Sequence, residues 1–516
     1  MARQKTSSFI IELPLTLSKS DEAEAIVRLD LSRKLFNACL DEALRRLDLM
    51  RESRAWHATG LLHRKSQKNE RKESFKLLNH QYGFLSASIS AFGTQCKNEA
   101  QWNDHLGAHE TQRIAERAFH AVEEHCFGKR GRPRFKGKFR PLHSMEGKSS
   151  GSGLKWNKEI GCLQWSGMFI PAMLPTDSKD PYLAEAMHAR TKYARIVWRT
   201  INGKRRWFAQ LIQEGQAPRK YETIENEIVG LDVGPSTIAV YSENGVALLP
   251  LCPEIDQPWS KVKRLQRAMD RSRRATNPSC YNKNGTFKKG AKIKVRSTHY
   301  QQVQNELAET ERILKETRDR SHGAMANKII ALGNVIKTEQ LSYKALQKNF
   351  GRSTKVRAIG AMMATIQRKA ESAGGEFIEL NTWRLKMSQY DHLTETYTKK
   401  KLSQRWHILG DGSGVVQRDM YSAFLAANAA GDVIHHHQVT KAWSTAQLLL
   451  ARAGWMQPQS VSVASLLATA PTLRAPERIA RERVLVTINA KDVVDLSIQS
   501  INREPLNACE SALRTP

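Results

Sequence analysis

The pattern of apolar and polar positions changes character several times along the chain. Residues 7–14 read as one strand, and apolar side chains then recur at helical spacing through residues 21–126. Between 151 and 215, short runs rich in β-branched and aromatic residues are separated by turns such as Asn202-Gly203. Because strands flank a helical block on both sides, we predict one β-barrel interrupted by a helical insertion.

A third pattern begins near residue 226. A strand hairpin comes first, and a long helical excursion over 258–327 follows. Another strand returns the chain to the sheet, and a helix at about 357–373 precedes a strand at 376–380. Alternating strands and helices favour a layered α/β domain, so the whole chain is predicted to be a multidomain α+β protein. After about residue 432 no motif can be read.

Composition adds a partner class to this picture. The chain has 516 residues, with 81 Lys and Arg against 51 Asp and Glu, a net charge of +30. Such an excess indicates contact with a phosphate backbone. A membrane surface is a weaker reading because the basic residues are not gathered on one amphipathic helix. No apolar run approaches the ~18–20 residues that span a bilayer, and no signal pattern opens the chain. The seven cysteines form no CxxC pair, as in a reduced cytoplasmic protein.

Two basic stretches are candidate nucleic-acid contacts. Residues 128–140 hold seven basic residues, three glycines, one proline and two phenylalanines, which no core helix or strand tolerates. Cations and aromatic faces on a flexible backbone suit phosphate pairing and base stacking, and a solvated basic linker is the alternative. The second stretch, 261–296, is the basic part of the helical excursion. The predicted contact residues are Lys129, Arg130, Arg132, Arg134, Phe135, Lys136, Lys263, Arg264, Arg267, Arg271 and Arg274.

Three acidic residues carry the candidate chemistry. Asp232 and Glu339 each close a short apolar strand pattern, and Asp419 stands just ahead of a helix-like run. Carboxylates at two strand ends and one helix start are what an RNase H-like fold brings together to hold two divalent metals. Each acid alone has a plain alternative: a turn residue for the strand ends and a helix N-cap for Asp419. Asp411, in Asp411-Gly412, is interpreted as a hairpin turn residue.

Four segments resemble the TnpB family, the transposon-encoded RNA-guided DNA endonucleases related to compact type V CRISPR effectors. Gly230–Gly234 resembles the first RuvC motif, Lys337–Leu341 the second and Gln417–Leu425 the third. Gly131–Lys136 resembles the family's Pro-Arg-Phe-Lys segment, which precedes its barrel strands. The likeness covers residues 7–430 or so.

The resemblance implies an architecture and a site. It predicts a first barrel strand at 1–20, a helical recognition domain at 21–127 and the rest of a wedge-like β-barrel at 128–225. A RuvC nuclease domain follows at 226–432, with a basic helical insertion at 258–327, and a C-terminal extension occupies 433–516. It also predicts that Asp232, Glu339 and Asp419 are catalytic and bind two Mg²⁺ ions. Arg418 would orient Asp419 or contact a phosphate, and a purely structural ion pair is the alternative.

The implied activity is RNA-guided cleavage of DNA in the cytoplasm of a prokaryote. A guide RNA would select the target by base pairing, and double-stranded and single-stranded DNA would be the other partners. No membrane partner is expected. Three alternatives remain: a guided DNA binder that no longer cuts, a guide-free nuclease of the transposase or resolvase type, and a generic RNA-binding protein.

One departure from the family concerns zinc. Its members usually carry a zinc ribbon of paired cysteines between the second and third motifs, whereas residues 340–419 contain no cysteine. His392 and His407 cannot make a tetrahedral site alone. We therefore predict no structural zinc and an Asp411-Gly412 hairpin packed directly in its place.

Overall fold

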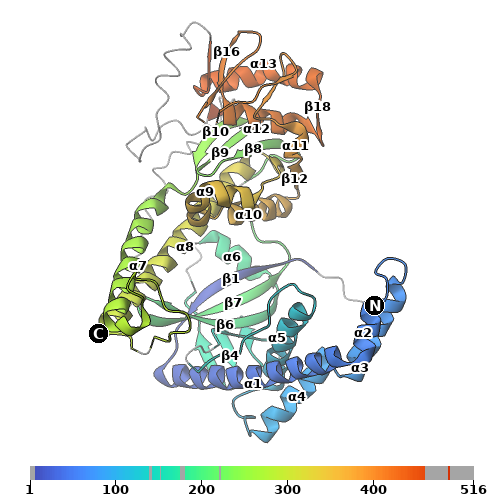
Figure 1. The fold of residues 1–516 in the computed structure, drawn as a ribbon, viewed down its shortest axis with the longest axis vertical. Coiled ribbons are helices and arrows are strands. Elements are labelled where there is room, and N and C mark those ends of the chain that lie inside the picture. Colours follow the sequence, from blue (N-terminus) through green and yellow to red (C-terminus); the bar gives the residue numbers. More distant parts are fainter. Residues whose placement is uncertain are drawn as a thin grey trace. The chain divides into compact units, whose positions relative to one another are not determined.

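The computed structural model describes residues 6–138, 142–151, 153–174, 180–219, 222–293, 295–401 and 403–458, and a strand at 486–487. The chain divides into two compact units, Met1–Pro218 and Arg219–Pro516 (Figure 1). Among the described residues, none of the helices is long and apolar enough to cross a membrane. Each unit has its own core and its own sheets.

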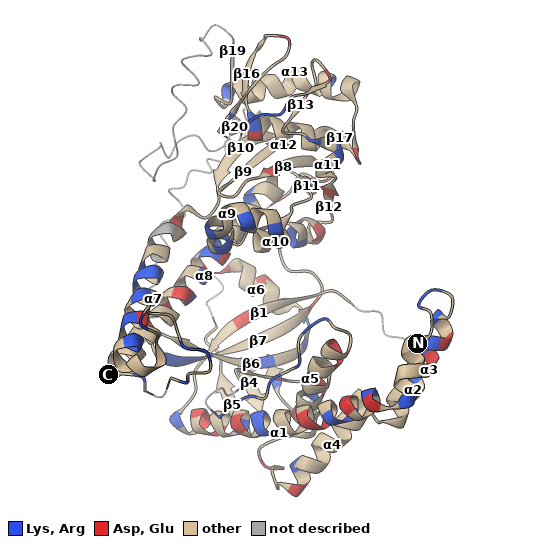
Figure 2. Ribbon diagram, viewed as in Figure 1, with Lys and Arg blue, Asp and Glu red and all other residues tan. Residues whose placement is uncertain are grey.

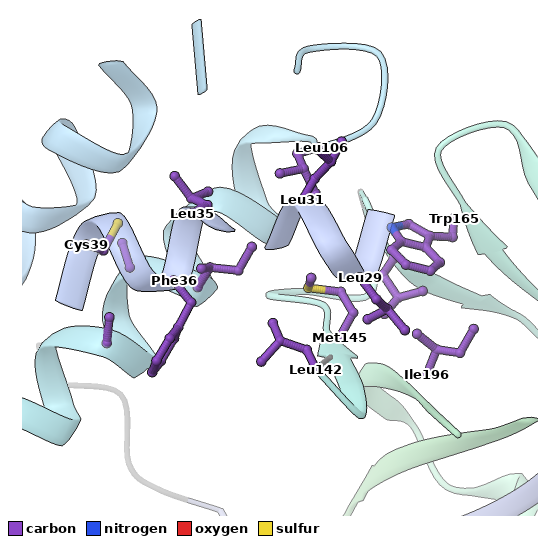
Figure 3. Close-up of a cluster of buried hydrophobic side chains, with 14 of the residues drawn as sticks. Leu29, Leu31, Leu35, Phe36, Cys39, Leu106, Leu142, Met145, Trp165 and Ile196 are labelled. Carbon is purple, nitrogen blue, oxygen red and sulfur yellow. The ribbon is translucent and has the colours of Figure 1, made fainter. Parts of the chain in front are cut away.

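Unit 1 is built around one long helix. Helix α1 begins after Ser18, whose hydroxyl accepts a hydrogen bond from the Asp21 amide at 3.0 Å. Figure 3 shows Leu29 and Phe36 of this helix in a buried cluster with Ile196 of the adjacent sheet. The predicted helical block is confirmed as α1 (Lys19–Glu52), α2 (Arg54–Leu61), α3 (Lys68–Gln81), α4 (Ser86–Glu99) and α5 (Ala108–Cys126). A shorter helix, α6 (Pro181–His188), follows later.

The strands of unit 1 flank this helical block, as predicted. The first strand pairs antiparallel with the last over its whole length, from Ser8–Glu214 to Leu15–Trp207. The predicted Asn202-Gly203 turn joins two long strands into a hairpin. The strands are β1 (Ser8–Leu15), β2 (Ser144–Glu146), β3 (Lys155–Asn157), β4 (Cys162–Trp165), β5 (Met168–Pro171), β6 (Thr191–Ile201) and β7 (Lys204–Glu214).

These strands do not form the predicted wedge-like β-barrel. In the described residues they make an open sheet of order β1-β7-β6-β2 and a separate sheet β3-β4-β5. Two backbone hydrogen bonds link the described parts of these sheets: the Thr16 amide donates to the Pro171 carbonyl and the Met173 amide to that of Pro14, each at 2.9 Å. A local bridge of this kind leaves both sheet edges largely unpaired, so the barrel is not closed.

Unit 2 carries a six-stranded sheet of order β12-β11-β8-β9-β10-β20. The predicted hairpin is the β9–β10 pair, which turns at Glu243-Asn244 with Gly245 opposite Ser242, and the strands after it confirm the predicted alternation with helices. The strands are β8 (Ile228–Val233), β9 (Thr237–Ser242), β10 (Gly245–Pro250), β11 (Val335–Glu339), β12 (Glu376–Leu380) and β20 (Val486–Thr487). Strands β8, β11 and β12 are mutually parallel, whereas β9 and β10 are antiparallel to their neighbours.

The predicted helical excursion is a helical hairpin (Figure 1). Its arms are α7 (Asp256–Thr276) and α8 (Thr298–Leu332), with short 3₁₀ turns at Pro253–Ile255 and Pro278–Cys280. The helices beside the sheet are α9 (Tyr343–Arg357), α10 (Ile359–Ser372), α11 (Thr382–Leu385), α12 (Arg418–Asn428) and α13 (His436–Arg452).

Short strands fill the region around α12. They are β13 (Tyr390–Asp391), β14 (Thr396–Tyr397), β15 (Trp406–Ile408), β16 (Gly414–Gln417), β17 (Ala429–Ala430), β18 (Val433–Ile434) and β19 (Met456–Pro458). The Asp411-Gly412 turn between β15 and β16 is confirmed: the Asp411 carboxylate accepts from the Ser413 amide at 2.9 Å, and Gly412 has φ of 74°.

Candidate functional site

Two of the three acids lie at the same end of two neighbouring strands. Strands β8 and β11 are parallel, and Leu231 is in register with Thr338. The residues that follow, Asp232 and Glu339, are therefore level with each other and point to the same face of the sheet. The two acids are more than a hundred residues apart in the sequence, and the pairing of β8 with β11 makes them neighbours in space.

The third acid is brought to this face by helix α12. Gly230 of β8 lets the helix pack closely, because a Cβ on Gly230 would overlap the Ala423 carbonyl and lie 2.5 Å from the Ala427 amide nitrogen. The small residues of the helix and this glycine thus set the distance between helix and sheet. Asp419 lies in the first turn of α12, at the end that is near Asp232.

Gln417, and not Asp419, caps this helix. The Gln417 side-chain oxygen accepts a hydrogen bond from the Met420 amide at 2.6 Å. The N-cap alternative for Asp419 is therefore wrong, and its carboxylate is left for other contacts. The far end of α12 is held by Lys337 of β11, whose ammonium donates to the carbonyls of Ala427 at 3.0 Å and Ala429 at 2.8 Å.

The electrostatics show that the three carboxyl groups act on one another. Burial raises the pKa of Asp232 well above its ordinary value, and the negative charges of Asp419 and Glu339 raise it further. The Arg418 guanidinium and the Ser422 hydroxyl oppose this rise. Burial alone raises the pKa of Glu339 to about 7. The ionised forms of Asp232 and Glu339 are thus disfavoured at this edge of the sheet, and a bound cation would favour them.

The Asp419 carboxylate pairs with two arginine side chains in this structure. One of its oxygens accepts from Arg418 Nε at 3.2 Å and Nη2 at 3.1 Å, and the other accepts from Gln417 at 3.3 Å. Arg405 adds an ion pair at 3.6 Å. Arg418 is itself held by the Gln404 carbonyl at 3.0 Å. The ion pair that sequence left open for Arg418 is present, and a phosphate contact stays a prediction.

The fit of these acids to Mg²⁺ has two sides. Carboxylate oxygens are the ligands that Mg²⁺ prefers, and three of them converge here. Within the described ranges, however, no group of three Asp, Glu, His or Cys side chains is close enough to hold a metal ion. The donor set therefore suits the metal, and Asp419 would have to exchange its guanidinium partners to complete the site.

A buried polar cluster occupies the region where the family's zinc ribbon was expected. The Asp391 carboxylate accepts from His407 Nε2 at 3.0 Å and from the Gly410 amide at 2.9 Å. The Tyr421 hydroxyl contacts His392 twice, accepting from its amide at 3.0 Å and lying 2.6 Å from Nδ1. His407 stacks on the Tyr421 ring with centroids 4.7 Å apart. Since Tyr421 belongs to α12, the cluster fastens the helix that carries Asp419 to the β15–β16 hairpin.

The predicted nucleic-acid residues fall into two sets in different units. In unit 2, the ribbon of α7 carries many Lys and Arg positions (Figure 2). Lys263, Arg267, Arg271 and Arg274 share one face of this helix, whereas Arg264 is exposed but does not line that face. In unit 1 the stretch from Lys129 to Lys136, with Arg130, Arg132, Arg134 and Phe135, follows α5 without secondary structure. Phe139 and Arg140 lie outside the described residues.

Sequence reasoning missed the role of α13. Its buried residues Val439, Trp443 and Ala446 recur at helical spacing and pack against α12 in one core with Phe424. Their i, i+4, i+7 spacing is the sequence signal that predicts a packed helix here, although no motif lies beyond residue 432. The core around the candidate site therefore extends to Met456.

Comparison with known proteins gives weak likenesses only. No family model matches the chain, and no curated protein matches it. The chain is similar to one in the cryo-EM structure of a Cas12f1–sgRNA–target DNA complex, with 11% identity, a TM-score of 0.41, and coverage of 81% of this chain and 98% of that one. It is also similar to one in the cryo-EM structure of a CRISPR–Cas12f ternary complex, with 14% identity, a TM-score of 0.27, and coverage of 79% and 82%. Values this low assign neither fold nor function.

Proposed function

We propose that this protein is a metal-dependent nuclease, specifically an RNA-guided DNA endonuclease with a RuvC-like site. The observation that carries the nuclease is the convergence of Asp232, Glu339 and Asp419 at one sheet edge, where the charges of two raise the pKa of the third. Carboxylates from different elements that repel one another are unfavourable for the fold by themselves, and a function that needs a cation explains them.

The three acids would act as metal ligands. Asp232, at the end of the central strand β8, would hold the metal ions together with Glu339 and Asp419. Two Mg²⁺ ions supply an activated water and stabilise charge on the attacking and leaving oxygens of the phosphodiester. The chain's own contribution is position: Gly230, Lys337 and Tyr421 fix α12 on the sheet, so that Asp419 stands opposite the strand ends.

RNA guidance is supported by sequence and charge. The four segments that resemble the TnpB family include one, Gly131–Lys136, outside the nuclease unit. The net charge of +30 and the cationic face of α7 provide phosphate contacts that carry no base information. Base pairing by a bound RNA would then supply the specificity. Guide RNA and target DNA are the partners of this proposal.

A second candidate function is favoured by one observation. Asp419 is ion-paired with Arg418 and Arg405, and no described cluster of three ligands is assembled. A guided DNA-binding protein without cleavage would tolerate this arrangement permanently, whereas a nuclease must release Asp419. Retention of all three acids favours the nuclease.

Two linked measurements test the proposal. The protein is expressed with its native flanking DNA, and the RNA that copurifies is sequenced; one discrete species with a constant scaffold and a variable end is expected. The purified complex is then given supercoiled DNA carrying the matching target in Mg²⁺. Cutting supports the endonuclease, and stable binding without cutting supports the second candidate. Heterogeneous RNA, or cutting that survives removal of RNA, would contradict guidance.

A further inference from the structure

The basic segment after α5 forms one wall of a groove in unit 1. The other walls are Phe36 of α1 and Arg117, His120 and Ala121 of α5. The groove has a volume of about 680 Å³, within the range of ligand-binding clefts. Six of its lining residues are basic and none is acidic: Arg117, His120, Arg130, Arg132, Arg134 and Lys136.

The segment is fastened in place, so the solvated-linker alternative does not describe it. The Asn37 side chain forms a pair of hydrogen bonds with the backbone of Lys136, accepting from its amide and donating to its carbonyl, each at 2.9 Å. Arg33 adds a bond to the same carbonyl at 3.2 Å. Arg132 is held by both oxygens of Asp48, at 3.1 and 2.8 Å. Tertiary contacts therefore build this wall, although no helix or strand does.

The charges inside the groove are only partly neutralised. Arg130 pairs with Glu124 at 2.8 Å, but Glu146, the carboxylate whose charge acts on Arg117, is already shared by Arg113 and Arg195, each at 3.0 Å. Burial, and then the charge of Arg117, lower the pKa of Lys136. Burial also lowers the pKa of Arg117. The groove thus holds cations that repel one another and have lost part of their hydration.

An aromatic group completes the site. The Lys136 ammonium lies 5.1 Å from the centre of the Phe36 ring, which belongs to the buried cluster of Figure 3 and keeps the lysine over the groove. Phe135, the residue before Lys136, is 55% exposed but is not one of the residues that line the groove. The groove itself therefore offers cations and the Phe36 ring.

We propose that this groove binds the phosphodiester backbone of a nucleic-acid strand, with Arg117, Arg134 and Lys136 contacting phosphates. Arg117 and His120 come from α5 and were not predicted from sequence. The proposal rests on the proposed function for the identity of the strand, RNA or DNA. Its chemistry rests on unit 1 alone and does not involve the three acids.

The test measures binding and not cleavage. RNA-free, full-length protein is titrated onto fluorescent single-stranded RNA and DNA of one base sequence, at several salt concentrations. The variant is Arg134→Gln with Lys136→Gln; it keeps the backbone bonds of Lys136, and Arg134 is exposed, so folding is preserved. The control is Lys72→Gln with Lys76→Gln, which removes two exposed charges from α3.

The groove variant is expected to bind on the order of tenfold more weakly, with a log–log salt slope shallower by about 1.4, since each single-strand phosphate contact contributes ~0.7. The control should change affinity less than about twofold. A larger loss with RNA identifies an RNA strand, a larger loss with DNA a DNA strand, and equal losses a contact to backbone shared by both.

Equal affinity and slope for the groove variant and the control would overturn the proposal. That failure is separate from failure of the proposed function. If wild type cuts DNA while the groove variant binds like the control, the nuclease stands and the groove proposal is wrong. If the groove variant loses affinity while wild type does not cut, the groove proposal stands and the endonuclease is wrong.

Discussion

Gly230 and Ala423 are in contact where the helix bearing Asp419 crosses the strand bearing Asp232. A Cβ at position 230 would overlap the Ala423 carbonyl oxygen, which is backbone and cannot rotate away. The pair therefore sets how closely α12 approaches β8, and with it the separation of two of the three acids. The sequence placed Gly230 in a motif, and the structure shows why a residue without a side chain is needed at this position.

Replacing this glycine is expected to be destabilising. Gly230→Ala must push α12 off the sheet, at about 1–3 kcal/mol of unfolding free energy, the usual effect of overpacking. Thermal melting measures this effect, and loss of any nuclease activity should accompany it. Gly323→Ala is the matched control: a Cβ there meets nothing within 4 Å in helix α8, so it should stabilise by about 0.5–1 kcal/mol. Equal melting of the two variants would contradict the packing argument.

The mutual repulsion of the acids predicts a stabilising substitution. Burial and the charges of Asp419 and Glu339 disfavour the ionised form of Asp232, which the unfolded chain adopts at neutral pH, so without divalent metal Asp232→Asn should raise the unfolding free energy by about 1–2 kcal/mol. Mg²⁺ should raise the melting temperature of wild type and not that of the variant, because a ligand stabilises only the state that binds it.

Asp411→Asn is the control for that experiment. It removes the same charge from an exposed turn, so Mg²⁺ should stabilise it as it does wild type. A wild-type melting temperature that does not respond to Mg²⁺ would count against a metal site at these acids.

The buried histidine beside Tyr421 predicts sensitivity to acid. Burial lowers the pKa of His392 from 6.5 to about 4, with the charges of His436 and His407 acting in the same direction and Asp391 opposing them. Above pH 6.5 the imidazole is neutral in both folded and unfolded chains. Between 6.5 and 4 the unfolded chain takes up a proton that the folded chain refuses, so stability falls by up to about 3 kcal/mol.

The raised pKa values of Glu339 and Asp232 stabilise the fold as pH falls over the same range, so the measured quantity is the difference between wild type and His392→Gln in denaturant unfolding between pH 7 and 4.5. His392→Gln cannot take up that proton, so its stability at pH 4.5, relative to pH 7, should exceed that of wild type. Asp391 does not confuse the result: hydrogen bonds from His407 and backbone amides outweigh its burial and hold its pKa at about 2, so its contribution is lost only below about pH 4. Identical slopes for the two proteins would contradict the assignment to His392.

Local patterns predicted most helices and strands of the fold but not which strands pair at the edges of each sheet. The strand hairpins and the long helices were readable because periodicity and turn residues such as Asn202-Gly203 are local. Closure of a barrel depends on pairing between strands far apart in sequence, and that prediction was wrong. The capping role of Gln417 was missed because Asp419, a more common cap, stands two residues away.

The site shows the same limit. Strand-end acids could be picked out, since each follows an apolar run, but the order of β11 beside β8 is what makes Asp232 and Glu339 neighbours. The ion pair between Asp419 and its sequence neighbour Arg418 was among the alternatives, but nothing local indicated that Arg405 would pair with Asp419. Long-range ion pairs of this kind depend on loops whose paths no short pattern specifies.

The central claim is that Asp232 acts in metal-dependent cleavage of DNA. The most direct measurement compares cutting of supercoiled target DNA in Mg²⁺ by the guide-loaded wild type, Asp232→Ala and the turn control Asp411→Asn. The account predicts that Asp232→Ala loses cleavage by orders of magnitude while it still binds target, and that Asp411→Asn cuts like wild type. Undiminished cleavage by Asp232→Ala would contradict the account.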